Sequence, residues 1–386
     1  MKRTRAWPVG DVGIGVAATG PAGPFTIAEA RHRFADAFRP RAWIYWSDFL
    51  ATTAVCWTAL AVSARVPLGA PLHLASTLVA MVALFRAAIF VHEIAHQQRG
   101  ALPGFEFAWN ILVGVPFLAP SLTYVGSHLD HHRQASFGTW NDPEYLPLAR
   151  STPLRHLGFL LVPTVEVLMF PVRWGVLGPA SWVIPPLRRW LIARASTLVL
   201  NPRYRRPAPK GRDTARWMAQ EAAAAALVWL VAGSFVAGRV PVQWLVQWYV
   251  VLVGALVLNQ ARNLAAHRYE NDGQPTDSLG QLLDSVTLEG RLLSALAAPV
   301  GLRYHALHHY LATVPYHSLG TLHRRLLAEL PADDPYRRTR CSGVVAAAFA
   351  LARRAAARRA CVSSTGTRGI KEDEMQVFDA LKERKP

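Results

Sequence analysis

The stretch LHLASTLVAMVALFRAAIFVHEIAH, residues 72–96, decides how this chain folds. Residues 72–91 are mostly apolar, and a helix of about 20 such residues crosses the hydrocarbon core of a bilayer. The stretch then ends in HEIAH, where His92 and His96 are four positions apart. A helix places two such residues on one face, as two ligands of one metal ion require. The stretch therefore predicts a membrane span with a metal site at its end.

Three other apolar blocks resemble this one, at about residues 43–64, 217–238 and 242–258. The turns within each pair, RVPLGAP and GRVP, are too short to hold a domain, so the four blocks form two helical hairpins. Nearly all other Lys and Arg residues lie outside the pairs, and cytoplasmic segments carry such an excess. We therefore expect a bacterial inner-membrane protein whose active site and both termini are cytoplasmic.

The composition favours the same class of protein. The chain is 52% hydrophobic and only 17% charged, whereas soluble proteins have about 25% charged residues. Its net charge of +17 resides in clusters that could bind nucleic acid. Because these clusters flank apolar blocks, we interpret them as determinants of membrane topology and expect membrane lipids, not nucleic acid, as partners.

The expected fold class is an all-α integral membrane protein with four transmembrane helices and a cytoplasmic helical cap that carries the metal site. Residues 1–42 form a partly disordered N-terminal segment, 43–330 the membrane domain, and 331–386 a basic, partly disordered tail. That tail contains a basic, Ala-rich helix, VVAAAFALARRAAARRA, suited to an anionic membrane surface. Residues 107–125 and 157–182 are apolar but rich in proline, which favours interfacial or re-entrant helices; six spans are the alternative.

Two further stretches share an H-x-x-H-H spacing: GSHLDHHRQ, residues 126–134, and LRYHALHHYL, residues 302–311. Each places its three histidines, at i, i+3 and i+4, on one face of a helix. A further histidine, His267, follows the fourth apolar block in ARNLAAHRYEN. The candidate metal ligands and catalytic residues are therefore His92, His96, His128, His131, His132, His267, His305, His308 and His309.

Eight or nine imidazoles are enough for two metal ions. Imidazole binds iron, copper, nickel and zinc, so the ligand type alone does not select the metal. Carboxylates often orient such histidines through the second ring nitrogen, and the candidates in or beside the boxes are Glu93, Asp130, Asp142 and Glu144. The alternative is an intramembrane zinc protease in which Glu93 of HEIAH acts as general base. It would leave both H-x-x-H-H boxes without a role.

The three boxes, in this order and with paired spans, resemble the membrane fatty acid desaturase superfamily. FGTWNDPEYLPL, NLAAHRYEN and VPYHSLGTLHRRL add to the resemblance, which covers about residues 40–330. It implies a histidine-ligated, non-haem diiron centre that uses O2 to remove hydrogens from an acyl chain. The nine histidines would then be iron ligands, and Asn263 a water-mediated partner.

The resemblance implies a fatty acyl desaturase that introduces a C=C bond; a lipid or carotenoid hydroxylase or ketolase with the same diiron site is the alternative. The substrate would be a fatty acyl lipid or an acyl carrier. Reducing equivalents would come from a ferredoxin or a cytochrome-type donor, because the sequence contains no flavin, haem or Fe–S motif. The basic cytoplasmic face could attract an acidic donor of this kind.

Overall fold

The computed structural model describes residues 26–98, 100–198 and 200–365, with side chains as far as residue 358. The expectations of disorder for most of the N-terminal segment and for the last residues of the tail lie outside the described residues. The described part is mostly helical and contains only two short strands, which confirms an all-α integral membrane protein as the fold class.

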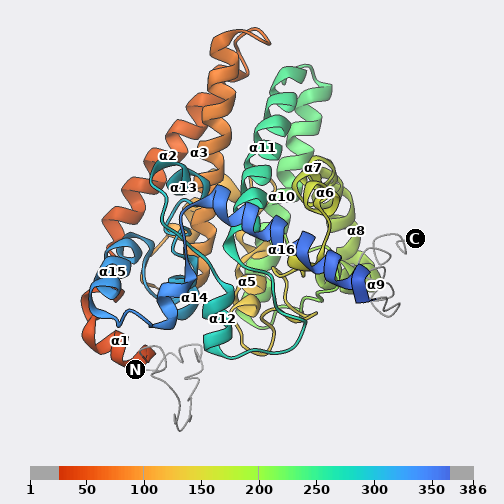
Figure 1. Cartoon of the computed structure of the whole chain (residues 1–386). Coiled ribbons are helices and arrows are strands. Elements are labelled where there is room, and N and C mark those ends of the chain that lie inside the picture. The colour runs from red at the N-terminus through yellow and green to blue at the C-terminus, as the bar shows by residue number, and fades with distance from the viewer. Residues whose placement is uncertain (1–25, 99, 199, 366–386) are drawn as a thin grey trace.

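Two helical hairpins dominate the structure (Figure 1). The first consists of α2 (Ala42–Ser63) and α3 (Pro71–His96), and the second of α10 (Arg212–Val236) and α11 (Val242–Ala266). Pro71 occupies the first position of α3, where the fixed φ of proline suits a helix start and its missing N–H leaves no bond unmade. The four expected helical blocks are therefore present and paired as predicted.

The second hairpin extends further than its apolar blocks. Helix α10 begins at Arg212 rather than near residue 217, and α11 continues past residue 258 to Ala266. The last turns of α11 carry Gln260, Arg262 and Asn263, which are buried and hydrogen-bonded to one another or to Asn259. Burial against the cap therefore sustains the helix where hydropathy ends, and it places His267 directly after the last turn.

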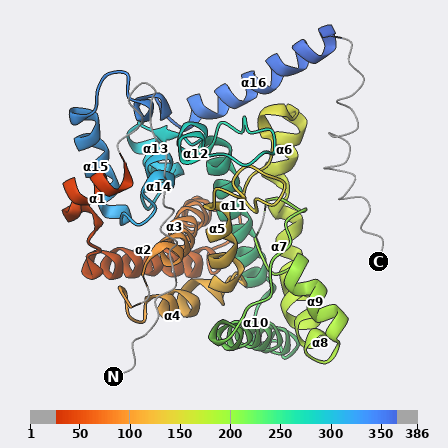
Figure 2. The ribbon, with the colours of Figure 1, turned by 90° about the horizontal axis from the view of Figure 1, so that it is seen from below.

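In the described part of the chain, four helices are long and apolar enough to cross a membrane: Pro71–His96, Pro153–Val183, Arg212–Val236 and Val242–Ala266. This set differs slightly from the four spans expected from the sequence. Helix α2 is missing from this set because Asp48 and several hydroxyl residues lower its hydropathy, although it packs along α3. Residues 153–183 run across the hairpins rather than along them, as Figures 1 and 2 show together. This orientation favours the interfacial prediction for residues 157–182 over a further span.

Shorter elements form the interfacial segments. Residues 153–183 comprise three α-helices and a π-helical turn, and α9 follows them; the elements are α6 (Pro153–Leu161), α7 (Pro163–Val172), η5 (Arg173–Leu177), α8 (Gly178–Val183) and α9 (Pro185–Arg194). The stretch 107–125, for which an interfacial or re-entrant helix was expected, does not form a single helix. The chain is broken near Pro116 and Pro120, where Leu118 has a φ of 53°. It contains α4 (Phe105–Trp109), the π-helix η2 (Asn110–Gly114), the 3-10 turn η3 (Ser121–Thr123) and the start of α5 (Val125–His131).

The cap lies at the end of the hairpins where α3 and α11 finish (Figure 1). Its remaining elements are α1 (Ile27–Arg33), η1 (Ala35–Phe38), η4 (Leu148–Arg150), α12 (Ser278–Asp284), β1 (Thr287–Leu288), α13 (Leu292–Ala297), α14 (His305–Tyr310), α15 (Tyr316–Glu329), η6 (Pro335–Thr339), β2 (Arg340–Cys341) and α16 (Val344–Thr365). A separate apolar core formed by α1, η1, α12, α14 and α15 holds the cap together.

Residues 285–288 tie two parts of the cap together. Val286 N–H donates to Ala266 O at 2.9 Å, and Leu288 N–H donates to Arg303 O at 2.7 Å. Strand β1 also pairs in parallel with β2. This short segment therefore fixes the end of α11 against the start of α14, which brings His267 next to His305.

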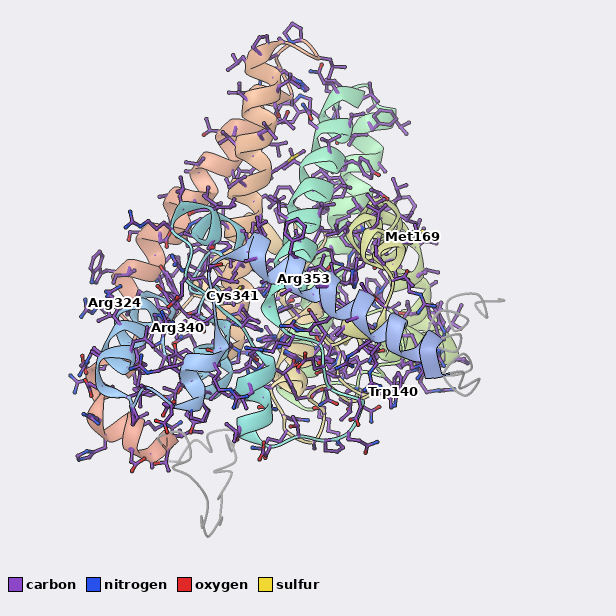
Figure 3. The ribbon with its side chains drawn as sticks, viewed as in Figure 1. Trp140, Met169, Arg324, Arg340, Cys341 and Arg353 are labelled. Carbon is purple, nitrogen blue, oxygen red and sulfur yellow. The ribbon has the colours of Figure 1, made fainter. Side chains whose placement is uncertain are left out.

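The basic helix expected in the tail is α16. It packs against α11 and η4 and carries Arg353 and Arg354 (Figure 3). Phe349 on this helix is 66% exposed, and Met169 on α7 is 51% exposed. Both helices lie near the level where the hairpins meet the cap (Figure 1), as expected of elements at a membrane surface.

Candidate metal centre

Four elements bring the nine predicted histidines together. The last turn of α3 carries His92 and His96, and His267 follows α11. Helix α5 with its C-terminal residue carries the second box, and α14 carries the third. The side chains separate into two groups. Group A consists of His92, His96, His128, His132 and His308; group B consists of His131, His267, His305 and His309. Within each group the candidate ligand atoms all lie within 4.8 Å of one another.

Each H-x-x-H-H box contributes to both groups. In the second box, His128 and His132 join group A, whereas His131 joins group B. In the third box the allocation is reversed, because His305 and His309 join group B and only His308 joins group A. Residues i and i+4 point almost the same way from a helix, and the intervening histidine points to the adjacent face. The spacing therefore suits a helix packed between two neighbouring metal ions.

The Nε2 atoms converge at separations that suit metal ligands. In group A, His128 Nε2 lies 2.9 Å from His96 Nε2 and 3.1 Å from His132 Nε2. In group B, His305 Nε2 lies 3.0 Å from His267 Nε2 and 3.1 Å from His309 Nε2. Two nitrogens at about 2.0–2.1 Å from one ion and at a right angle to each other would be about 3 Å apart. The donor set therefore fits two metal ions.

Burial keeps most of these imidazoles in the neutral form that ligates metal. Desolvation, together with repulsion between neighbouring histidines, lowers the pKa of His128, His132, His305, His308 and His309 well below the usual value. Burial opposes charge on His131 too, but the adjacent Asp142 carboxylate outweighs it and raises the pKa of His131. A site of neutral donors favours cations of the type that imidazole binds, iron among them.

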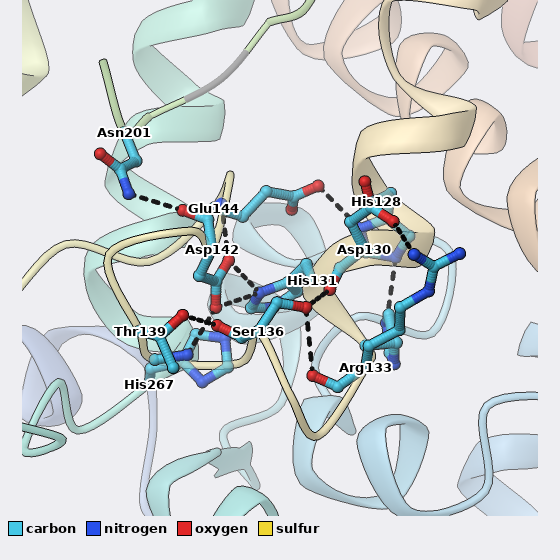
Figure 4. Close-up of polar contacts among 12 residues, drawn as sticks. His128, Asp130, His131, Arg133, Ser136, Thr139, Asp142, Glu144, Asn201 and His267 are labelled. Carbon is cyan, nitrogen blue, oxygen red and sulfur yellow. Dashed lines mark hydrogen bonds and ion pairs between the residues drawn. The ribbon is translucent and has the colours of Figure 1, made fainter. Parts of the chain in front are cut away.

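Two carboxylates contact ligand Nδ1 atoms at hydrogen-bond distance, and a third lies at ion-pair distance from another Nδ1. His128 Nδ1 lies 2.8 Å from Glu144 Oε1, and His131 Nδ1 lies 2.8 Å from Asp142 Oδ1 (Figure 4). His267 Nδ1 lies 3.5 Å from Asp284 Oδ2. A proton held on Nδ1 by a carboxylate leaves Nε2 free to ligate. The roles predicted for Asp142 and Glu144 therefore agree with the geometry, and Asp284 is a partner that the sequence motifs did not reveal.

The Asp142 carboxylate is itself held in place. It accepts hydrogen bonds from Gly138 N–H at 2.7 Å and from Glu144 N–H at 2.8 Å. Gly138 has a φ of 70°, a conformation that glycine adopts without the strain of a side chain. Asn201 donates to Trp140 O and Asp142 O, and so closes the loop over the site (Figure 4). The FGTWNDPEY stretch thus forms a rigid support for His131 and His128.

Two of the residues predicted to support the ligands, Asp130 and Asn263, have other contacts. Asp130 pairs with Arg133 at 2.7 Å and accepts from Tyr204 OH at 2.6 Å, so its carboxylate turns away from the histidines. Asn263 binds Arg262 and Gln260 rather than a ligand. Asp130 therefore makes no direct contact with the histidines, because the helix rotation that aims His131 inward aims Asp130 elsewhere. The water-mediated role expected for Asn263 stays a prediction.

Glu93 also lies outside both groups. Its Oε2 accepts from Tyr45 OH at 2.5 Å and from Tyr316 N–H at 3.1 Å, and its Oε1 is 3.6 Å from His92 Nδ1. These contacts tie α3 to α2 and α15. A zinc protease would need this carboxylate as a free base beside the metal, so the geometry disfavours that alternative.

A buried arginine near the site was not anticipated. Arg262 is only 7% exposed, and its guanidinium donates to Asn259 Oδ1 at 3.1 Å and to Asn263 Oδ1. Its positive charge adds to burial in lowering the pKa of His305. The sequence offered one signal for this residue: it is a charged side chain within the last turns of an otherwise apolar helix.

Asp142 and Asp130 form a matched pair for testing the orienting contacts. Asp142→Asn is expected to lower activity or metal affinity by about 10- to 100-fold, because His131 loses its anionic partner. Asp130→Asn removes the same charge from helix α5, where the carboxylate contacts Arg133 and Tyr204 but no ligand, and should leave both nearly unchanged. Metal content and turnover of the purified variants measure the effect; equal losses in the two variants would contradict the assignment.

Known families agree with this geometry. The chain matches the fatty acid desaturase family model over residues 68–340. It is 42% identical over 320 residues to the ceramide hydroxylase of Caulobacter vibrioides (strain NA1000 / CB15N), an alignment that covers 83% of this chain and 91% of that one. No solved structure matches the chain. These similarities confirm the resemblance based on the three histidine boxes: the protein belongs to the fatty acid desaturase family, membrane oxidoreductases of the histidine-ligated diiron type.

Proposed function

We propose that this protein is a lipid hydroxylase that uses O2 and two iron ions to convert a C–H bond of a ceramide-like lipid into an alcohol. The observation that carries the proposal is the similarity to a ceramide hydroxylase along nearly the full length of that relative. The two histidine groups support the same class of chemistry. The proposal replaces desaturation with hydroxylation as the first expectation, and desaturation becomes the competing outcome.

The side chains suit this task. Iron in groups A and B would supply the redox chemistry for an aliphatic C–H bond, which side-chain acids and bases cannot break. The nine imidazoles would hold the two ions, with Asp142, Glu144 and Asp284 fixing the orientation of three of them. Burial of the histidines keeps bulk water away. The apolar stretches of α3 and α11 precede the histidines, so a lipid chain would approach the site from the bilayer.

Electron balance requires an external donor. Hydroxylation consumes one O2, two electrons and two protons, places one oxygen atom in the product and releases one water. Desaturation consumes the same reactants but releases two waters and leaves a C=C bond. We therefore expect a ferredoxin or cytochrome-type donor, attracted by the basic surface of the cap. With the cap on the cytoplasmic side of a bacterial inner membrane, donor and site would lie in the same compartment.

The two reactions give products of different mass. We expect membranes containing this protein, supplied with a long-chain ceramide, a reductase system and 18O2, to form a ceramide with one added 18O atom. Liquid chromatography with mass spectrometry measures the product. A ceramide that has only lost two hydrogens would replace hydroxylation with desaturation, and the absence of any change in ceramides or acyl lipids would contradict both.

A histidine variant and its control link the product to the site. His308→Ala removes one group A imidazole and should abolish product formation. His32→Ala changes an exposed histidine of α1, outside both groups, and should leave it intact.

A further inference from the structure

A second polar feature lies outside the histidine groups. A cavity of about 260 Å³ is bounded by α3, by α13 with the chain that follows it, and by the start of α15. Its polar lining consists of Arg86, Arg303, Tyr304, Tyr316 and His317. Arg303 and Tyr304 directly precede His305, so this cavity is next to the chain segment that enters group B.

The cavity lies where membrane and cap meet. Arg86 precedes His92 by six residues, which is about 9 Å along the axis of α3. Helix α13, which contributes Ala295 to the cavity, exposes Leu292, Leu293 and Leu296 by 72%, 59% and 50%. It lies beside the hairpins above α14 and α15 (Figure 1). A short helix that turns three leucines outward at this level suits contact with lipid acyl chains.

The lining carries one positive charge without a carboxylate partner. Arg86 is neutralised by Asp48, which is 2.6 Å away and also accepts from Tyr316 OH. Within the described residues, Arg303 in contrast donates only to backbone oxygens, those of Leu288, Glu289 and Gly290, at 2.7–3.2 Å, and its guanidinium lies over the Tyr304 ring. Neither aspartate nor glutamate lines the cavity.

Two neutral side chains complete the lining. Burial, reinforced by the charge of Arg41, lowers the pKa of His317, so this imidazole is neutral at pH 7. In the described part of the chain, no hydrogen bond is seen for the Tyr304 hydroxyl. The lining therefore offers one net cation together with a hydroxyl donor.

We propose that this cavity binds the phosphodiester headgroup of an anionic membrane lipid, whose acyl chains lie along the leucines of α13. A phosphodiester carries one negative charge, which matches the uncompensated charge of Arg303, and its oxygens accept from the guanidinium and from Tyr304. Inorganic phosphate shares this chemistry but lacks the apolar chains. The bound lipid would brace residues 298–304, which lead into His305. This inference does not depend on the reaction that the enzyme catalyses.

Lipid binding to the full chain purified in a neutral detergent tests the proposal. Native mass spectrometry should show that dioleoylphosphatidylglycerol binds about tenfold more tightly than dioleoylphosphatidylcholine, because the choline cation of the latter cancels the charge of its phosphodiester; added salt should weaken this preference. Ala295→Phe fills the cavity without removing a polar contact and should abolish the preference. Tyr304→Phe removes one donor and should reduce it in part.

Leu296→Phe is the matched control, because it makes an aromatic substitution on the same helix at an exposed position that does not line the cavity. It should retain the preference for phosphatidylglycerol. Equal binding of the two lipids by the wild-type chain would overturn the proposal. So would an unchanged preference in Ala295→Phe, or competition by millimolar inorganic phosphate as strong as that by the lipid.

Discussion

His305→Ala is expected to halve the iron content of the purified protein, from about two ions per chain to about one, and to abolish oxygenation. Group B has four imidazoles, and the loss of His305 leaves three. His305 Nε2 also lies within 3.1 Å of both His267 and His309, so its removal breaks the centre of the group. The loss of activity should exceed the about 10- to 100-fold that removal of an outer partner costs.

A comparison between the groups sharpens this expectation. His308→Ala leaves four imidazoles in group A, so it should lose less metal than His305→Ala although activity disappears in both. Elemental analysis of the purified chains measures the iron, and His32→Ala serves as the control. One bound zinc per chain, together with a proteolytic activity that His305→Ala leaves intact, would instead support the protease alternative.

Glu221→Ala is expected to destabilise the membrane domain by about 3–5 kcal/mol, because it leaves two arginines without their shared carboxylate. Glu221 is 1% exposed and pairs with Arg173 NH2 at 2.9 Å and with Arg188 NH1 at 2.5 Å. Arg173 is only 8% exposed, so water cannot replace the lost partner. This ion triad joins α10 to η5 and α9, which connects the second hairpin to the interfacial segment.

Denaturant titration in detergent micelles measures the free energy of unfolding. Arg189→Ala, at an exposed position of α9 next to Arg188, is the control and should change stability by less than 1 kcal/mol. The double variant Glu221→Leu with Arg173→Met should recover part of the loss, because it removes the more deeply buried of the two unpaired charges and leaves only that of Arg188, which is closer to solvent. A shift no larger for Glu221→Ala than for Arg189→Ala would contradict the role of the triad.

Hydropathy and histidine spacing were sufficient to predict the two helical hairpins and most of the candidate metal ligands. The apolar blocks predicted two hairpins because a bilayer requires long helices whose side chains are apolar. The spacing in HEIAH, HLDHH and HALHH predicted eight of the nine ligand candidates, because helical periodicity is local and can be read along the sequence. The ninth, His267, was indicated by its position after the fourth apolar block. Hydropathy did not predict the breaks within residues 107–125, where prolines divide one apolar stretch into several short elements.

Only the tertiary structure decided how the ligands are shared and what supports them. The division into groups A and B depends on how α5 and α14 are rotated against α3 and α11, which packing determines. The choice of Asp284 rather than Asp130 as a histidine partner has the same origin. Sequence by itself determined which side chains can bind metal, because that depends on residue type and helical spacing. Their partners depend on contacts between separate elements, such as Glu144 with His128 or Asp284 with His267, and these exist only once the elements have packed.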